Sequence, residues 1–398
     1  MKMHSGIRIF IPWILLLHIA LLVWVAWTLP IGPHEAKIFY GEKSIVAYLM
    51  HTGKLLLPDL DFINIRAPFL FIHLINLALF YQLCKLLLKN ETAIWTSFLI
   101  FLLLPGIVSS AILASATGII LALYQTFLIL FFRHKKYAAY LILPLFILID
   151  RSCVIFYFAL LTYALWRRDK FLLGLVIVLF GVAVSVYGID MHGRPVNHFT
   201  ETIGLYAAIF SPLLFLYFFY AIYRILFKGR KDIIWHVAFT ILLLSILISL
   251  RQRIPIEHFA PYVIVAIPLM VQLFFDSYRV RLPQFRRWYS AMALAVFGVL
   301  LLNTALLLIH RPLFLLLKNP KHHFAASFYM PYWCAKKLKD EGITHIKSGK
   351  FALQFRYYGI DDKGDETICF TPCQKYKKVS IRYKNREIGS CYVSKINI

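Results

Sequence analysis

The stretch Ile9–Leu29, IFIPWILLLHIALLVWVAWTL, is a continuous apolar run near the start of the chain. His18 is its one ionisable residue. A run of roughly 18 or more apolar residues is long enough to cross a bilayer as a helix. The apolar core of a secretory signal is shorter, about 7–15 residues, and Thr28-Leu29-Pro30-Ile31 is a poor cleavage site. We therefore predict an uncleaved first transmembrane helix.

Further apolar segments follow this run along most of the chain. They lie at 67–88, 93–108, 113–132, 137–150, 152–166, 171–189, 204–227, 233–250, 260–276 and 289–309. Of the 398 residues, 60% are hydrophobic and 16% are charged, whereas soluble domains carry about a quarter of charged residues. The sequence therefore predicts an α-helical polytopic membrane protein with about eleven transmembrane helices. The short segments 137–150 and 152–166 meet at Asp150-Arg151 and are predicted as half-helices or as a tilted pair.

Basic residues are concentrated in every second loop between these segments. The basic loops hold Lys85 and Lys89; Arg133, Lys135 and Lys136; Arg167, Arg168 and Lys170; Arg224, Lys228, Arg230 and Lys231; and Arg279, Arg281, Arg286 and Arg287. Short cytoplasmic loops of membrane proteins carry an excess of Lys and Arg. We therefore expect a multi-pass protein of a bacterial-type inner membrane, with a cytoplasmic N-terminus and an extracytoplasmic C-terminal region.

The net charge of +24 does not indicate a nucleic-acid-binding protein, because the positive residues are placed where they orient helices. Anionic lipid head groups and lipid-linked phosphates are the expected partners. The sequence contains no Walker loop, Rossmann fingerprint, HExxH motif or GxSxG elbow. No loop on the expected cytoplasmic side is long enough for a nucleotide-binding domain, so activated substrates are expected to arrive from the membrane or from outside.

Two regions interrupt the apolar pattern and define the predicted domains. Residues 1–310 form a predicted transmembrane domain that includes a long outside loop, 30–66, whose apolar spacing suits helices lying flat at the interface. Residues 311–398 form a predicted extracytoplasmic α/β domain. A helix is expected near 335–341, and strands are expected around 368–370, 379–383 and 390–393.

The tail also holds four of the six cysteines: Cys334, Cys369, Cys373 and Cys391. In an oxidising compartment four cysteines fit two disulfides, with three possible pairings. A zinc site that uses Cys369 and Cys373 and a set of free thiols are the other interpretations. Cys84 and Cys153 lie in apolar runs and are interpreted as buried hydrophobic side chains.

The predicted topology gathers ionisable residues at the outer face. They are Glu35, Asp59, Asp61, Arg66, Asp150, Arg151, His192, Arg194, His198, Glu201, Arg251, Arg253, Glu257 and His258. Ionisable residues near membrane spans are functional candidates, since they are costly to place there. Arginine binds phosphate oxygens in a bidentate manner, and a carboxylate can take a proton from an incoming hydroxyl or amine. This combination suits chemistry on phosphate-linked lipids.

Short motifs at the same positions resemble those of the GT-C superfamily of polyprenyl-phosphate-dependent glycosyltransferases. The nearest branches are the protein O-mannosyltransferases and the lipid A aminoarabinose transferases. The resemblance is carried by His34-Glu35-Ala36 after the first span, Arg66-Ala67-Pro68-Phe69-Leu70 at the second, and a late loop with Arg251-Gln252-Arg253, Glu257-His258, Pro261-Tyr262 and Pro268. The outside tail also matches, so the resemblance extends over most of the membrane portion.

The sequence departs from that family in its acidic residues. Family members usually have two adjacent acids in the first loop, whereas Glu35 stands alone here. They often carry a further aspartate before the fourth span, and Ser110–Gly118 contains no acid. Asp59 or Asp61 is the candidate for a second acid. These departures put catalytic activity in doubt and leave a non-catalytic binding protein of the same fold as one interpretation.

The resemblance implies a glycosyltransferase that moves a sugar from a polyprenyl phosphate to an extracytoplasmic glycan, lipid or protein. Glu35 would act as the general base, with or without a divalent metal ion. Arg66, Arg251 and Arg253 would bind the lipid phosphate, and Asp59, Asp61, Glu257 and His258 would complete the substrate site. A transporter or flippase of lipid-linked substrates is the other alternative, and it predicts broken helices and repeats.

Each of these residues also has a purely structural interpretation. Glu35 suits the positive end of a helix dipole, and Arg66, Arg251 and Arg253 suit anchoring at lipid head groups. Asp150 and Arg151 are predicted to form a self-neutralising structural pair. The histidines have no tight spacing that would indicate a metal site.

Overall fold

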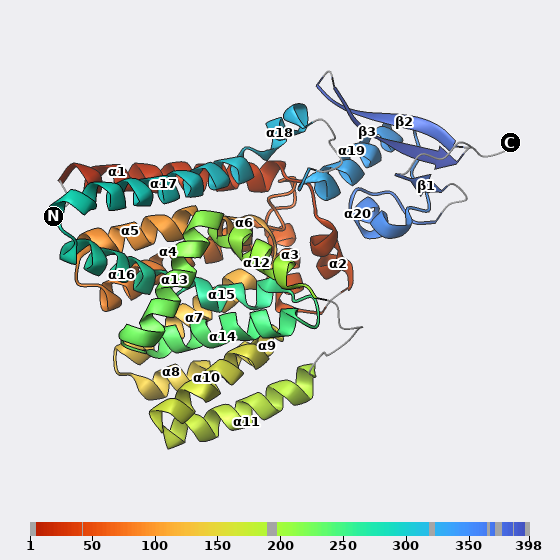
Figure 1. Cartoon of the computed structure of the whole chain (residues 1–398). Helices are drawn as coiled ribbons and strands as arrows, with labels where there is room; N and C mark the ends of the chain where they lie inside the picture. The colour runs from red at the N-terminus through yellow and green to blue at the C-terminus, as the bar shows by residue number, and fades with distance from the viewer. Residues whose placement is uncertain are drawn as a thin grey trace. The chain divides into compact units, whose positions relative to one another are not determined.

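The computed structural model describes residues 5–41, 43–188, 197–317, 323–363, 367–370, 376–384 and 386–394. These residues are mostly helical and include one small sheet (Figure 1). They divide into two compact units. The first unit holds the chain up to His18 and Phe69–Ala305, and the second holds Ile19–Pro68 and the chain from Leu306 onward.

The first unit is built from helices alone. Together with the beginning of α1 (Ser5–Thr28) it contains α4 (Ala67–Leu87), α5 (Glu91–Leu103), α6 (Pro105–Ile112), α7 (Thr117–Phe132), α8 (Lys136–Ile142), α9 (Leu145–Ile149), α10 (Cys153–Arg167), α11 (Lys170–Tyr187), α12 (Phe199–Phe210), α13 (Pro212–Lys228), α14 (Ile233–Ser249), the short 3-10 helix η1 (Ile256–His258), α15 (Ala260–Ile264), α16 (Ile267–Val280) and α17 (Pro283–Leu308).

Several of these helices are long and apolar enough to cross a membrane. Among the described residues five meet this criterion, or up to seven if each of two bent helix pairs is one span. Four shorter apolar helices, Thr117–Phe132, Lys136–Ile149, Cys153–Arg167 and Ile233–Ser249, accompany them. The chain is therefore a multi-pass membrane protein, and the count of eleven spans stays a prediction.

Two segments predicted as single spans, 93–108 and 204–227, are bent. The chain turns by 53° between α5 and α6 and by 104° between α12 and α13. Pro105 and Pro212 begin the second helix of each pair. Proline has no N–H and restricts the residue before it, so a helix ends readily at that point. Both segments are apolar over their whole length, which predicts one unbroken span for each. The two prolines are the sequence signal for the breaks.

Two adjacent residues of α17 form hydrogen bonds at the two breaks, one to a backbone carbonyl and the other to a side-chain hydroxyl. The hydroxyl of Thr304 donates to the carbonyl of Leu103, the last residue of α5. Asn303 Nδ2 donates to Ser211 Oγ at 3.0 Å, between α12 and α13. Polar groups freed at a break inside a membrane must find partners within the protein. Asn303 and Thr304 therefore stabilise both bends from one helix.

The second unit combines helices with a three-stranded antiparallel sheet. Its elements after the end of α1 are α2 (Pro33–Gly41), α3 (Ile45–Leu56), α18 (His310–Leu316), α19 (Ala326–Asp340), η3 (Gly349–Phe351), α20 (Ala352–Tyr357), β1 (Ile368–Cys369), β2 (Tyr376–Tyr383) and β3 (Arg386–Ser394). The strand order is β1-β3-β2, with Val379 opposite Cys391 (Figure 1). A helical and β-stranded tail was predicted, and β1 begins where expected, whereas β2 and β3 begin at earlier residues than expected.

Helix α19 packs against the sheet through one of its faces. Met330, Cys334 and Leu338 recur every fourth residue on this face and are buried. Cys334 forms a disulfide with Cys391 of β3. Gly389 of β3 lies against the end of the Met330 side chain, which would have to shift to admit a side chain at that position.

Residues 30–66 were predicted as an outside loop of the transmembrane domain 1–310. In the structure they belong to the same compact unit as the tail. Gln354 Nε2 of α20 donates to the carbonyl of Ile31 at 2.9 Å. Lys54 Nζ lies 5.2 Å from the ring centroid of Phe39 and 5.3 Å from that of Tyr357. The contacts of Gln354 with Ile31 and of Lys54 with Tyr357 join residues about 300 positions apart in the chain, which sequence spacing alone does not reveal.

Candidate functional site

Glu35 and Arg66, the predicted base and the predicted phosphate ligand, form a buried ion pair in the second unit. Glu35 lies in the first turn of α2, and Arg66 directly precedes α4. Arg66 Nη2 lies 2.6 Å from Glu35 Oε2, and Arg66 Nε donates to Oε1 at 3.0 Å. The two side chains are 0% and 3% exposed. This bidentate geometry is the strong form of the arginine–carboxylate pair.

The remaining donors of Arg66 bind the backbone at the end of α1. Nη1 donates to the carbonyls of Ala26 and Leu29, and Nη2 donates to the carbonyl of Pro30 at 2.9 Å. A guanidinium has five N–H donors, and these contacts use all of them. Glu35 Oε2 also accepts from the amide of Gly32 at 2.9 Å.

This geometry favours the structural interpretation of Glu35 and Arg66, and their catalytic and phosphate-binding roles stay predictions. Arg66 has no N–H left for a lipid phosphate, and it binds both carboxylate oxygens of Glu35. Nearby, burial raises the pKa of Tyr357 to about 12, so this phenol remains neutral beside the pair. The pair instead fixes the turn that joins α1 to α2.

Asp59 and Asp61 do not join this pair as a second acid. Both are exposed in the segment between α3 and α4. Asp61 Oδ2 accepts from Trp27 Nε1 at 3.2 Å. The two carboxylates therefore have no geometry in this structure that assigns them to a substrate site.

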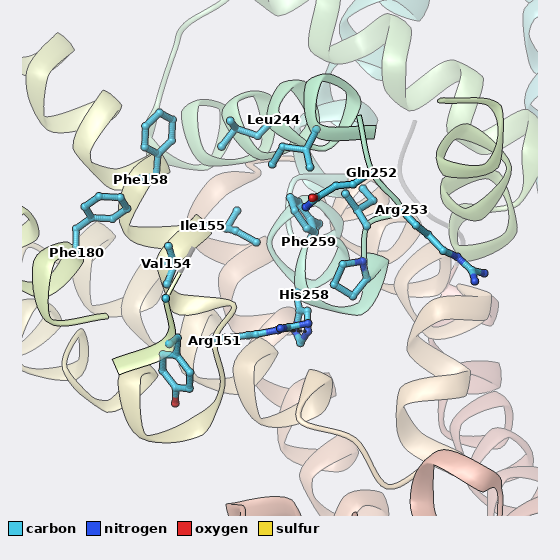
Figure 2. A pocket seen from close by; sticks show the side chains of 15 residues that line it. Arg151, Val154, Ile155, Phe158, Phe180, Leu244, Gln252, Arg253, His258 and Phe259 are labelled. Atoms are coloured by element: carbon cyan, nitrogen blue, oxygen red, sulfur yellow. Dashed lines mark hydrogen bonds between the residues drawn. The ribbon is translucent and has the colours of Figure 1, made fainter. Parts of the chain in front are cut away.

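Arg151, Arg253 and His258 of the predicted residues line a cleft of about 830 Å³ in the first unit (Figure 2). Its walls are apolar and come from α10, α11, α14 and η1 with its flanking residues: Val154, Ile155, Phe158, Phe180, Leu244, Ile248 and Phe259. Its polar lining includes Arg151, Gln252, Arg253 and His258. A cleft with apolar walls and a few polar groups suits a ligand with an apolar body and a polar head.

Arg151, His258 and Asp150 form a hydrogen-bonded chain beside the cleft. His258 Nδ1 lies 2.5 Å from Asp150 Oδ2, and Arg151 Nε donates to His258 Nε2 at 3.3 Å. Figure 2 shows the guanidinium of Arg151 against the ring of His258. Since Nε2 accepts, we assign the proton of a neutral imidazole to Nδ1. The predicted direct pair of Asp150 and Arg151 is thus bridged by His258.

Arg253 is held at the cleft by a different carboxylate. Its Nη2 lies 2.7 Å from Glu201 Oε1, and Glu201 Oε2 lies 3.0 Å from His198 Nδ1. The Arg253 side chain is 72% exposed, and in Figure 2 it extends away from Arg151 and His258. The guanidinium is therefore oriented by Glu201 yet accessible to a ligand.

A second cavity of about 440 Å³ shares this rim. Arg151 and Arg253 line both cavities, and Glu257 lines the smaller one. The carboxylate of Glu257 is exposed and has no hydrogen bond or ion pair to another residue of the described segments. Arg251, the neighbour of Arg253 in sequence, lines neither cavity. The structure therefore separates the two predicted phosphate ligands.

The described residues offer no metal centre. No group of three or more His, Cys, Asp or Glu side chains within those ranges is placed to hold a metal ion. Cys334 and Cys391 are joined to each other, which removes both from a zinc site. Cys373, His192 and Arg194 lie outside the described residues, so a second disulfide between Cys369 and Cys373 stays a prediction.

Sequence reasoning missed the contacts that make this site. The partners of Arg253 and Asp150 lie 52 and 108 positions away in the chain, and no local motif links them. The sequence signal that was available is the clustering of Arg251, Arg253, Glu257 and His258 in one short loop between apolar segments. That signal located the rim but did not identify the apolar cleft.

Comparisons with known proteins support the fold. No family model and no curated protein matches the chain. The crystal structure of ArnT from Cupriavidus metallidurans in the apo state is similar over 96% of this chain and 98% of that chain, with a TM-score of 0.51 and 11% identity. The two chains therefore share an overall fold.

Proposed function

We propose that this chain is a membrane glycosyltransferase that takes its sugar from a polyprenyl phosphate. The observation that carries the proposal is the cleft of about 830 Å³, in which apolar walls adjoin the guanidinium groups of Arg151 and Arg253. A prenyl chain suits the walls, and a phosphate suits two arginines. The fold shared with ArnT supports the same class of reaction.

In this proposal the phosphate of the donor lies at the shared rim of the two cavities. Arg151 and Arg253 would neutralise the charge that develops on the phosphate as it leaves, which is where electrostatic stabilisation is most effective. His258 and Asp150 orient Arg151, and Glu201 orients Arg253. The smaller cavity of about 440 Å³ would hold the sugar and the acceptor.

Glu257 is the proposed general base in place of Glu35. It would take the proton of an acceptor hydroxyl or amine while the acceptor atom bonds to the anomeric carbon. The bond from that carbon to the phosphate oxygen breaks, its electron pair leaves with the polyprenyl phosphate, and the anomeric configuration inverts. No step in this scheme uses a metal ion. The acceptor is an extracytoplasmic glycan, lipid or protein.

Binding of the lipid carrier is the first test. Native mass spectrometry of the purified chain would measure the affinity for a polyprenyl phosphate in the wild type and in Arg151→Gln/Arg253→Gln. Arg251→Gln is the matched control, because this arginine neighbours Arg253 but lines neither cavity. We expect roughly tenfold or greater weakening in the double variant alone. Equal affinities in all three proteins would refute the cleft as the carrier site.

Turnover is tested separately. Release of polyprenyl phosphate from a polyprenyl-phosphate sugar would be measured with a cell-envelope extract as the source of acceptor. We expect Glu257→Gln to lower the rate by about 10²–10⁴-fold while leaving carrier binding unchanged. Binding without release in the wild type would favour a non-catalytic binding protein of this fold.

A transporter of lipid-linked substrates is the second candidate, favoured by the two bent helix pairs. Helices α6 and α12, which adjoin the two breaks, contact each other. Broken helices commonly line the substrate sites of transporters. Movement of a labelled polyprenyl phosphate across a vesicle bilayer, without cleavage of the sugar bond, would support this candidate over the transferase.

A further inference from the structure

A separate cavity of about 360 Å³ lies in the first unit among α5, α13, α16 and α17. Its volume falls within the range of roughly 300–1,000 Å³ that is typical of small-molecule sites. None of its lining residues lines the proposed carrier cleft. Its basic residues, Arg224 and Arg281, belong to the loops that the charge pattern assigns to the cytoplasmic side.

The deeper wall of this cavity is apolar. Ile100, Leu214, Met270, Val271, Phe297 and Leu300 contribute to it. The helices that supply these residues are long and apolar enough to be spans, or parts of bent spans, so the cavity lies among helices that acyl chains surround. The interior therefore favours a hydrocarbon ligand over a soluble one.

The lining of the cavity includes two arginines held by tyrosines. The guanidinium of Arg281 lies 4.0 Å from the ring centroid of Tyr289, and Arg224 Nη1 donates to the hydroxyl of Tyr220 at 2.7 Å. The hydroxyls of Tyr289 and Tyr217 are 3.0 Å apart, which ties α17 to α13. Phe274 stacks on Tyr289 with centroids 4.7 Å apart. These contacts fix both cations in the lining before any ligand arrives.

Within the segments that the structure describes, neither arginine is neutralised by a carboxylate. Among the described residues no carboxylate forms an ion pair with Arg224 or Arg281, and none of the residues that line the cavity is Asp or Glu. Ser277 adds a hydroxyl to the lining. Two unpaired cations beside an apolar cavity are complementary to an anionic head group on an acyl chain.

We propose that this cavity binds an anionic phospholipid of the cytoplasmic leaflet, with the lipid phosphate between Arg224 and Arg281 and one acyl chain in the apolar interior. This site is distinct from the proposed carrier cleft and does not depend on the transferase reaction. The bound lipid would brace α13 against α17.

The test is lipid binding to the full-length purified chain, measured by native mass spectrometry. The probes are dioleoyl phosphatidic acid, dioleoyl phosphatidylcholine and inorganic phosphate. We expect one phosphatidic acid molecule to bind more tightly than the other two probes. In Arg224→Gln/Arg281→Gln this affinity should fall about tenfold, to the level of phosphatidylcholine. Arg167→Gln/Arg230→Gln removes the same charge outside the cavity and should retain wild-type affinity.

A second variant tests the interior while keeping both arginines. Ala293→Trp fills the cavity from α17 and should also lose the tight lipid. If Ala293→Trp lowers the thermal unfolding midpoint, Val296→Phe serves the same purpose with a smaller insertion. Three results would overturn the proposal. The first is an equal loss of phosphatidic acid affinity in the two double-arginine variants. The others are tight lipid binding by Ala293→Trp or Val296→Phe, and tighter binding of inorganic phosphate than of phosphatidic acid.

Discussion

The buried ion pair of Glu35 and Arg66 allows the loss of unfolding free energy in Glu35→Gln to be predicted. Changing Glu35 to Gln removes the charge that compensates Arg66, whose side chain is 0% exposed. Three of the five N–H donors of Arg66 would keep their carbonyl partners, and the other two would lose the carboxylate. Breaking a buried ion pair by neutralising one partner destabilises a protein by about 3–5 kcal/mol. We expect this loss to lower the unfolding midpoint of the second unit by about 10 °C.

The assay is thermal unfolding of the purified protein in detergent, together with limited trypsin cleavage at Lys37 and Lys54, which lie between Glu35 and Arg66 in sequence. Glu341→Gln is the matched control, because Glu341 pairs with Lys377 at 2.9 Å with side chains that are 37% and 57% exposed. An exposed pair of this kind contributes less than about 1 kcal/mol. A stable Glu35→Gln protein that has lost sugar transfer would refute the structural interpretation and restore Glu35 as the base.

Three further predictions concern other parts of the molecule. Thr304→Val removes the hydroxyl that donates to the carbonyl of Leu103. We expect thermal unfolding in detergent to show that the free energy of unfolding falls by about 0.5–2 kcal/mol. An unchanged midpoint would mean that another group binds this carbonyl. Replacing Cys334 and Cys391 by Ser removes a disulfide between positions 57 residues apart, and we expect a loss of about 2–4 kcal/mol by the same measurement. Burial lowers the pKa of His310 from 6.5 to about 4. The unfolded chain therefore binds the proton more readily than the folded chain does. The free energy of unfolding should fall by up to about 3 kcal/mol as the pH drops from 6.5 to 4. His310→Gln should flatten this dependence, and a pH profile identical to that of the wild type would contradict it.

The membrane class of this protein follows from its sequence alone. Runs such as Ile9–Leu29 exceed the length that a bilayer requires, and no soluble fold needs so many of them. The small helical and β-stranded tail was also predictable, because alternation and clustering of apolar residues around 379–383 and 390–393 are local signals. The shared fold with ArnT agrees with the GT-C resemblance of short motifs in the membrane portion.

The roles of the individual site residues were decided by tertiary structure. Glu35 and Arg66 are 31 residues apart, and the sequence does not show that they neutralise each other out of contact with solvent. Arg251 and Arg253 look equivalent in sequence, yet Arg253 alone lines the cleft because it pairs with Glu201 across a distance of 52 residues. Hydrophobic length and local periodicity depend on near neighbours in the chain, so the sequence determines them. Burial and ion pairing depend on which distant segments meet, and that is set by packing of the whole fold.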